Sequence, residues 1–279
     1  MPLTSDAAVL DTENYRFLTD YVYRESGIVL DNDKRYLLEA RLMPVVQDSQ
    51  LASLSALCSA LRGNATSPLR QKVVEAMTTH ETLFFRDATP FDALKSEILA
   101  QLVEHQKTAH RLSLWSAAAS SGQEAYSLAI LLLEAGLATW NLNILGTDLS
   151  AAILEKARQG RYMQLEMNRG LPAVHLVKYF ERDALDWRIK EHVRKMVRFE
   201  QFDLRKSMAN KGPFDLIFCR NVLIYFDIPT KKKILAELRG ALRPGGYLVL
   251  GSAESTLNLD ETYKRIQVGR ATFYQAPGN

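Results

Sequence analysis

Cysteine is scarce in this 279-residue sequence, which contains only Cys58 and Cys219. The two residues lie far apart in the chain and form neither a metal-ligand spacing nor a redox motif. We therefore expect no metal site and no disulfide framework, and we favour a reducing compartment. Without such crosslinks the chain depends on a hydrophobic core, and its 47% hydrophobic and 24% charged residues are ordinary for a globular protein.

Long apolar runs and a strong charge of one sign are missing too. No run approaches the roughly 20 residues that a membrane-spanning helix needs. The N-terminal segment lacks the basic group that opens a signal peptide. The formal net charge of +3 is too small to indicate nucleic acid binding by itself. These absences predict a cytoplasmic protein with no membrane insertion and no nucleic acid partner.

The first part of the chain shows only helical patterns. Apolar side chains such as Leu18 and Val22 recur at helical spacing. Gly27 is typical of a helix end, and Asp33 is a candidate cap for the helix that follows. The patterns predict helices over residues 14–25, 36–43, 51–61 and 69–77. We therefore expect an all-helical domain over residues 1–85.

Short apolar runs alternate with helical segments after about Leu112. The runs cover residues 112–117, 142–145, 197–202, 214–219 and 247–250, the last preceded by a Pro-Gly-Gly turn, and two strands over 263–268 and 271–275 close the chain. This alternation predicts an α/β domain over residues 86–279, with a parallel sheet buried on both faces. Residues 160–195 are too long and polar for an ordinary connection, so we expect an inserted subdomain there.

Small or polar residues follow directly after four of these runs. Open α/β sheets bind ligands beyond the carboxyl ends of their strands. Small residues over 116–122 would let a backbone approach a ligand, and Asp148, about 26 residues farther on, is placed to hold a ribose. Asp203 could bind an adenine edge, and Arg220 and Asn221 end the fourth run. Taken singly, a tight turn, a helix cap or an exposed loop acid would explain these residues as well, but the loop and Asp148 together favour a nucleotide-like ligand.

A polar and aromatic segment lies upstream, over residues 77–86. Phe84 and Phe85 are expected to pack in the core. His80, taken alone, is explained as a surface or capping histidine. Thr82 and Arg86 are four residues apart, so a helix would place them on one face.

Five blocks of the sequence follow one another in a recognisable order. They are Glu81-Thr82-Leu83-Phe84-Phe85-Arg86, Trp115-Ser116-Ala117-Ala118-Ala119-Ser120-Ser121-Gly122-Gln123-Glu124, Gly146-Thr147-Asp148, Phe218-Cys219-Arg220-Asn221-Val222-Leu223-Ile224-Tyr225-Phe226-Asp227 and Leu242-Arg243-Pro244-Gly245-Gly246. In this order they resemble the CheR family of chemotaxis receptor methyltransferases over nearly the whole chain. The resemblance implies a Rossmann-like S-adenosylmethionine-dependent methyltransferase sheet, an N-terminal helical receptor-docking domain and a small inserted β-subdomain.

The resemblance also implies the reaction and its cofactor. Family members transfer a methyl group from S-adenosylmethionine to glutamate side chains of chemoreceptors, giving γ-methyl esters and S-adenosylhomocysteine in sensory adaptation. Carried over residue by residue, the implied cofactor contacts are His80, Thr82, Arg86, Glu124, Asp148, Asp203, Leu204, Arg220 and Asn221. Two positions depart from the family pattern: His80 stands where asparagine is common, and Gln123 replaces the first glutamate of a Gly-Glu-Glu run.

A glutamate acceptor makes a general base unnecessary. Its ordinary pKa of about 4.3 leaves the carboxylate ionised at neutral pH, so catalysis would rest on proximity and orientation. An arginine or a tyrosine hydroxyl could align this carboxylate, and we predict that Tyr225 does so. The resemblance further implies that Lys34, Arg35 and Arg41 bind the acidic helices of the receptor's cytoplasmic domain. A solvated helix face, with Arg35 paired to Glu39, would explain these cations as well.

The inserted subdomain bears on a second receptor contact. Some relatives use it to bind a pentapeptide tether at the receptor C-terminus, and they carry a glycine-rich loop between its strands. Residues 181–188 contain no glycine here, which predicts that tether binding is absent.

Two other functions stay open at this point. An S-adenosylmethionine methyltransferase for small molecules or nucleic acid is disfavoured, because the fourth strand lacks an Asn/Asp-Pro-Pro-Tyr/Phe pattern and the chain lacks a basic stripe. A non-catalytic signalling adaptor is disfavoured by the intact loop with Asp148, Arg220 and Asn221.

Overall fold

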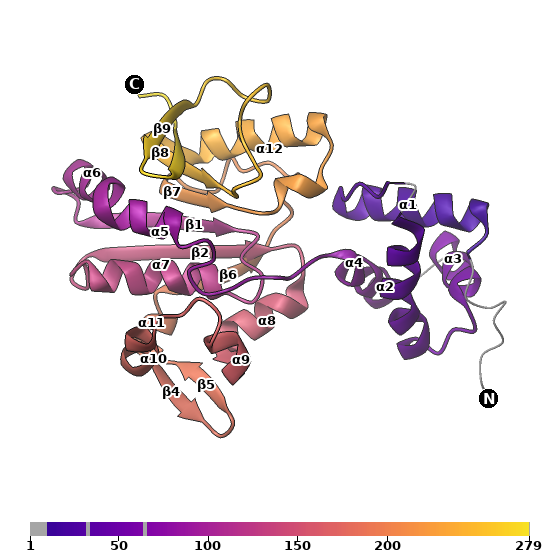
Figure 1. The fold of residues 1–279 in the computed structure, drawn as a ribbon. Helices are drawn as coiled ribbons and strands as arrows, with labels where there is room; N and C mark the ends of the chain where they lie inside the picture. Colours follow the sequence, from indigo (N-terminus) through magenta and orange to yellow (C-terminus); the bar gives the residue numbers. More distant parts are fainter. Residues whose placement is uncertain (1–9, 32–33, 64–65, 279) are drawn as a thin grey trace. The chain divides into compact units, whose positions relative to one another are not determined.

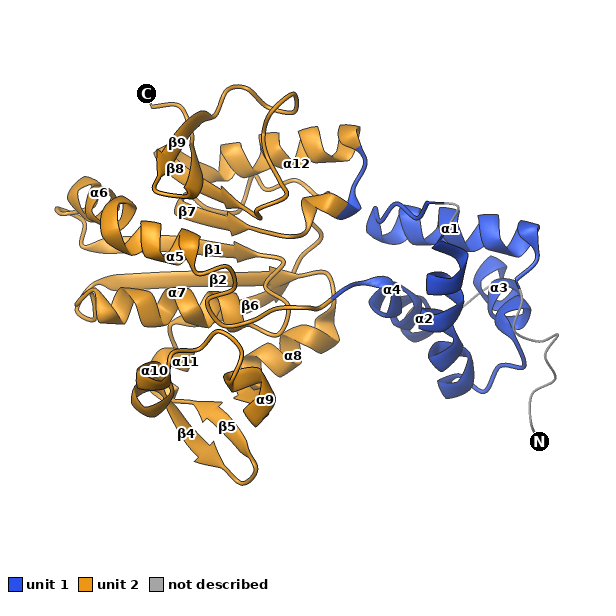
Figure 2. Cartoon of the chain, in the orientation of Figure 1, with its two compact units in different colours: residues 1–79, 225–227 blue, residues 80–224, 228–279 orange. Residues whose placement is uncertain are grey.

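The computed structural model describes residues 10–31, 34–63 and 66–278. Contacts divide the chain into two compact units (Figure 2). Unit 1 holds the described residues up to Thr79 together with Tyr225–Asp227, and unit 2 holds His80–Ile224 and the chain from Ile228 onward. The boundary predicted between residues 85 and 86 falls within unit 2.

Unit 1 is built from α-helices around a hydrophobic core of its own (Figure 1). Its helices are α1 (Thr12–Ser26), α2 (Arg35–Asp48), α3 (Leu54–Arg62) and α4 (Ser67–Met77). Asp11 caps α1 by accepting the N–H of Asn14, and Gly27 ends the helix with φ at 76°. The predicted cap Asp33 lies outside the described residues. Fully buried Leu18, Val22 and Leu42 form part of the core, in agreement with the helical spacing of the sequence.

The core of unit 2 is a seven-stranded sheet in the order β6-β2-β1-β7-β8-β10-β9. Its strands are β1 (Arg111–Ala117), β2 (Asn141–Asp148), β6 (Val197–Gln201), β7 (Phe214–Cys219), β8 (Leu242–Leu250), β9 (Lys264–Val268) and β10 (Ala271–Gln275). The first five in this sheet order pair in parallel, and β10 pairs antiparallel with both β8 and β9. This is the predicted α/β methyltransferase sheet with its terminal hairpin.

Helices pack against the sheet. They are α5 (Thr89–Ala93), a π-helical turn (Leu94–Ile98), α6 (Leu99–His105), α7 (Gln123–Glu134), α8 (Ala151–Gln159) and α12 (Ile228–Ala241). Helix α7 packs on β1, β2 and β6, and α12 packs on β8. Among the described helices, none is long and apolar enough to cross a membrane.

The insertion forms a small sheet in the order β3-β5-β4. The elements of the insertion are β3 (Arg161–Tyr162), α9 (Gln164–Met167), α10 (Ala173–Tyr179), β4 (Phe180–Asp183), β5 (Asp186–Ile189) and α11 (Glu191–Arg194). In Figure 1, β4 and β5 lie apart from the strands of the main sheet. Phe84 joins it to the core, because its fully buried ring packs edge-on against Tyr162 and Phe180. A Cβ on Gly170 would stand 2.1 Å from the Phe84 carbonyl oxygen, so only glycine fits there.

Candidate functional site

The loop between β1 and α7 has an unusual backbone. Ala118, Ser120 and Gly122 all have positive φ, at 65°, 51° and 94°, a region that L side chains rarely adopt. The resulting turn aims the N–H of Ser120 at Asp148 Oδ2, at 2.9 Å. The N–H of Ser150 donates to the other carboxylate oxygen, Oδ1, at 3.0 Å. The loop and the end of β2 therefore meet at one carboxylate.

Asp148 is buried, with 8% of its surface exposed. Burial raises the pKa of this carboxyl group, and the backbone N–H bonds and the nearby His80 oppose that rise only in part. Phe202, which follows β6, donates its N–H to the Asp148 carbonyl oxygen at 2.9 Å. The carboxyl ends of β2 and β6 are thereby held beside each other.

A second cluster forms around Glu124, in the first turn of α7. Ser116 Oγ donates to Glu124 Oε1 at 2.7 Å, and Arg220 Nη1 donates to Oε2 at 3.1 Å. Arg220 Nη2 also donates to Asp87 Oδ2 and to the carbonyl oxygen of Arg86, both at 2.9 Å. The Arg220 side chain is only 1% exposed. Its charge is thus committed to an internal network that ties β1, α7 and the segment before α5 to β7.

Residues 80–87 are irregular, with a turn at Phe84 and Phe85, and do not form the helix that would put Thr82 and Arg86 on one face. The helical interpretation is wrong because Phe85 and Asp87 have positive φ, at 49° and 53°. Arg86 Nη1 instead donates to the carbonyl oxygen of Glu81 at 2.8 Å. Thr82 lies half-buried on this segment.

The same segment contacts the loop after β1 at His80. Ser120 Oγ donates to the His80 carbonyl oxygen at 2.8 Å. Farther along, the Phe85 N–H donates to Ser127 Oγ at 2.9 Å. Phe85 packs against the core and Phe84 lies within it, as the sequence predicts.

The residues after β6 already have partners within the protein. Both oxygens of Asp203 accept hydrogen bonds from Arg205, the shortest from Nη2 at 2.6 Å. Leu204 is buried at 6% exposure. An adenine contact at Asp203 would have to share its carboxylate with this arginine.

Asn221 and Tyr225 follow β7 and differ in their surroundings. Asn221 is half-buried in unit 2, with φ at 56°. Tyr225 groups with unit 1, where its side chain packs against the helical core and its carbonyl oxygen accepts the N–H of Val29 at 2.9 Å. Tyr23 of the same unit donates its hydroxyl to Asp227 Oδ2 at 2.6 Å.

The three cations predicted to bind substrate all lie in unit 1. Lys34 pairs with Asp31 at 3.0 Å. The Arg35 guanidinium lies 4.9 Å from the centre of the Tyr15 ring and donates to the Leu10 carbonyl oxygen. Arg41 donates to the Met77 carbonyl oxygen at 2.8 Å and to the Thr79 hydroxyl at 2.9 Å. Arg41 therefore secures the end of α4, and the other two keep part of their charge at the surface.

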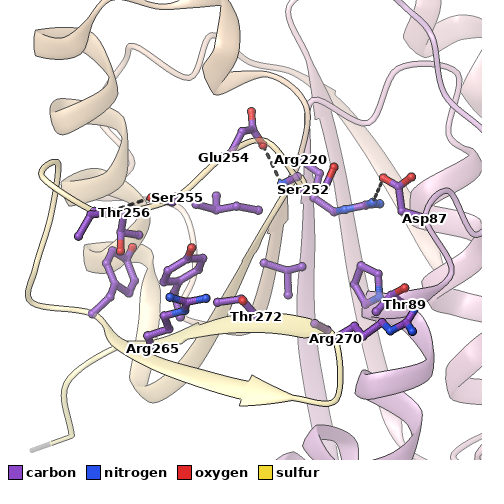
Figure 3. Close-up of a pocket in the computed structure, with 18 of the residues that line it drawn as sticks. Asp87, Thr89, Arg220, Ser252, Glu254, Ser255, Thr256, Arg265, Arg270 and Thr272 are labelled. Carbon is purple, nitrogen blue, oxygen red and sulfur yellow. Dashed lines mark hydrogen bonds and ion pairs between the residues drawn. The ribbon is translucent and has the colours of Figure 1, made fainter.

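A cavity of about 620 Å³ opens in unit 2 beside the Arg220 network. Figure 3 shows Arg220 and Asp87 facing each other on one side, with Arg265 on β9 and Arg270 in the turn of the terminal hairpin. Three arginines and three carboxylates line it, so the formal charges of its lining sum to zero. Asp148 does not line this cavity. Across the described ranges, no group of three or more metal-binding side chains comes together.

Two family models match the chain in sequence order. "CheR methyltransferase, all-alpha domain" matches residues 13–78, and "CheR methyltransferase, SAM binding domain" matches residues 80–272. The chain belongs to the CheR methyltransferase family. The boundary between the matched regions of this CheR-family protein coincides with the boundary between units 1 and 2.

Curated relatives match this CheR-family protein nearly from end to end. "Chemotaxis protein methyltransferase Cher2" of Pseudomonas putida is 38% identical over 273 residues, covering 96% of this chain and 98% of that protein. "Chemotaxis protein methyltransferase 1" of Pseudomonas aeruginosa is 40% identical over 276 residues, covering 97% and 99%. Among solved structures, a TehB-like SAM-dependent methyltransferase of Corynebacterium glutamicum is 17% identical, with a TM-score of 0.37, and covers 63% of this chain and 84% of its own.

S-Adenosylmethionine is the cofactor of this CheR-family protein, and unit 2 has the groups to hold it. A carboxylate offers about four lone-pair sites. Asp148 uses some of these sites to accept the backbone N–H groups of Ser120 and Ser150, and the others remain as acceptors for ribose hydroxyls. Helix α7 begins without a side-chain cap, which leaves its first N–H groups available to a ligand. A Cβ on Gly146 would stand 2.6 Å from the Phe199 ring, so the backbone beside this loop is closely packed.

Hydrogen bonds join five of the nine predicted cofactor residues of this CheR-family protein in two separate networks. They connect His80 with Asp148 through Ser120, and Arg86 with Glu124 through Arg220. Asp87 and Glu254 both line the cavity described above, and neither was predicted from the sequence to be a site residue. Glu254 lies just beyond the fifth apolar run, so the rule that polar residues follow strand ends could have found it.

Proposed function

We propose that this CheR-family protein transfers a methyl group from S-adenosylmethionine to glutamate side chains of chemoreceptors. The products are glutamyl methyl esters and S-adenosylhomocysteine, and the role is sensory adaptation in the cytoplasm. The observation that carries the proposal is the near end-to-end match to proteins named chemotaxis protein methyltransferases, at 38% and 40% identity.

The chemistry of unit 2 supports a carboxylate acceptor. Bound S-adenosylmethionine supplies an electrophilic methyl group on a positively charged sulfur. Cys219 ends β7, but burial raises the pKa of its thiol well above the ordinary range. A thiolate nucleophile is therefore not available there. An ionised glutamate needs neither a nucleophilic residue nor a general base, so the protein has only to bind and orient the two reactants.

Peptide mapping would test the acceptor residue. The purified chain is incubated with S-adenosylmethionine and the cytoplasmic fragment of a chemoreceptor, and the fragment is digested and analysed by mass spectrometry. We expect the mass of a methyl group added to glutamate-containing peptides. Methylation confined to lysine, cysteine or a small molecule in the preparation would refute the glutamate assignment.

Tyr225 is proposed to align the acceptor carboxylate through its hydroxyl. Tyr225→Phe should lower kcat about tenfold or more, the effect of one lost orienting hydrogen bond of about 1.4 kcal/mol. The Kd for S-adenosylmethionine should stay nearly unchanged. The ring keeps its place against the helical core of unit 1 in this variant, so folding should be preserved. An unchanged kcat at saturating receptor would remove Tyr225 from the mechanism.

Receptor docking is proposed for the helical unit through Lys34, Arg35 and Arg41. Lys34 pairs with Asp31 and Arg35 donates to the Leu10 carbonyl oxygen, and surface interactions of this kind are weak enough to exchange for an acidic partner. Arg41 contributes through the helix end that it secures.

Tether binding is proposed to be absent. Strands β4 and β5 are joined by a tight turn at Ala184 and Leu185, and the turn contains no glycine. Isothermal titration calorimetry with a receptor-tail pentapeptide should therefore give no binding in the micromolar range. Micromolar binding to this protein would prove the expectation wrong.

A further inference from the structure

Glu254 lies in the loop that follows β8, and its carboxylate collects five backbone N–H groups. Oε2 accepts from Gly251 at 2.7 Å and from Asn221 at 2.8 Å. Oε1 accepts from Val222 at 2.9 Å, Leu223 at 2.8 Å and Ile224 at 3.3 Å. Four of these donors belong to the loop after β7. One side chain thus joins the loops at the carboxyl ends of two adjacent parallel strands.

The bonds to Glu254 are directed at backbone rather than at another charge. Within the described ranges Glu254 forms no ion pair, and five N–H dipoles surround its negative charge instead. Hydrogen bonds to an ionised acceptor are stronger than neutral ones. The arrangement therefore holds the backbone of residues 221–224 in one conformation.

That conformation includes one left-handed residue, in a region that asparagine tolerates better than most L residues. Asn221 has φ at 56°, in the left-handed region. Gly251 leaves no spare room opposite, because a Cβ there would stand 2.7 Å from Glu254 Oε2 and 2.8 Å from both the backbone nitrogen and Nδ2 of Asn221. The preceding residue, Arg220, is fixed by its side chain to Glu124 and Asp87. Arg220 and Asn221 are thus fixed independently, the first by its side chain and the second by its backbone.

We propose that Glu254 is a positioning residue for cofactor binding: its carboxylate fixes the backbone of Asn221 so that the Asn221 side chain is presented to S-adenosylmethionine. The inference rests on the proposed assignment of Asn221 to the cofactor. Glu254 itself acts through the loop, because both of its carboxylate oxygens are occupied by the five N–H groups.

Glu254→Gln separates this role from a general effect on folding. The glutamine side chain has nearly the same size, but its NH₂ group must take the place of Oε1 or Oε2. In either position a donor would face the backbone N–H donors that the carboxylate oxygen accepts. The matched control is Glu261→Gln, because Glu261 is an exposed carboxylate that lines the same cavity and makes no bond to residues 221–224. Titration calorimetry with S-adenosylhomocysteine, well below the unfolding temperature, should show about tenfold weaker binding for E254Q, roughly 1.4 kcal/mol, and unchanged binding for E261Q.

A double-mutant cycle with Asn221→Ala tests whether Glu254 acts through Asn221. If it does, E254Q should weaken binding by less than about twofold when N221A is already present, because the side chain that it positions is gone. The backbone amide chemical shifts of residues 221–224 should change in E254Q and stay the same in E261Q. This measurement reports on the conformation of the loop even if E254Q also lowers the melting temperature.

Normal affinity in E254Q beside weakened binding in N221A would overturn this proposal alone. The proposal would also fail if the two effects multiply in the double variant, because Glu254 would then act independently of Asn221. Normal affinity in N221A would overturn the assignment of Asn221 to the cofactor and this inference with it.

Discussion

Asp148→Asn should weaken S-adenosylhomocysteine binding about 100-fold. The carboxylate is buried and already orients two backbone N–H groups, and its remaining lone pairs are the acceptors available to a ribose. A hydrogen bond to a charged acceptor is worth roughly 1.5–3 kcal/mol, so losing the charge and one acceptor should cost about 2.7 kcal/mol of binding. Titration calorimetry of the purified variant measures this directly.

A second buried aspartate provides the control for this experiment. Asp215 is 3% exposed and bonds to the N–H of Ser113 and the side chain of Gln106, but it lies near the amino end of β7. Asp215→Asn should lower the free energy of unfolding and leave the affinity for S-adenosylhomocysteine unchanged. Equal losses of affinity in both variants would mean that the effect reflects damage to the sheet.

The affinity should also depend on pH in a direction set by Asp148. Burial raises the pKa of its carboxyl group, and only the ionised form offers acceptors on both oxygens. Binding should therefore weaken on acidification at a higher pH than the ordinary aspartate pKa of about 3.9 would give. The Asp148→Asn variant should lack this dependence.

Arg220→Met should lower the free energy of unfolding of unit 2 by about 3–5 kcal/mol. Methionine fills much of the space, but it leaves Glu124 as a buried carboxylate without its cationic partner, and breaking a buried pair from one side typically costs this much. All three tryptophans, Trp115, Trp140 and Trp187, lie in unit 2. Urea unfolding followed by tryptophan fluorescence therefore reports on the unit that contains the change.

Adding Glu124→Gln to this variant distinguishes the cause. The double variant removes the orphaned charge and keeps a partner for Ser116, so it should recover part of the lost stability. Unchanged stability in Arg220→Met combined with weak S-adenosylhomocysteine binding would instead mean that the guanidinium serves the ligand directly, as its position in the sequence suggests.

Much of the fold could be predicted because the apolar pattern is strong where elements are buried. The predicted helix over 14–25 corresponds to Thr12–Ser26, and the run over 214–219 matches β7 (Phe214–Cys219). The expected turn at 244–246 is wrong, because these residues lie inside β8 (Leu242–Leu250). The pairing register shifts there between Phe214 and Leu216 on β7, so the Pro-Gly-Gly segment is an irregularity within the strand.

The positions of Asp148 and Asn221 at strand ends could be predicted, because polar residues follow the buried strands of an α/β sheet. Their roles in cofactor binding stay predictions. The same rule could not reveal that Arg220 turns inward to Glu124, or that Asp203 is paired with Arg205, because side-chain partners depend on tertiary packing. The irregular conformation of residues 80–87 could not be predicted either, because it accompanies the packing of Phe84 against Tyr162 and Phe180 of the inserted subdomain.

Alkali lability of the transferred methyl group tests the identity of the acceptor most directly. The purified protein is incubated with tritiated S-adenosylmethionine and membranes that contain candidate chemoreceptors, with the Asp148→Asn variant as the control. We predict label on the receptor band that alkali releases as volatile methanol, and little label with the variant. Normal binding of S-adenosylmethionine with no receptor label, or with label that resists alkali, would contradict glutamate methylation.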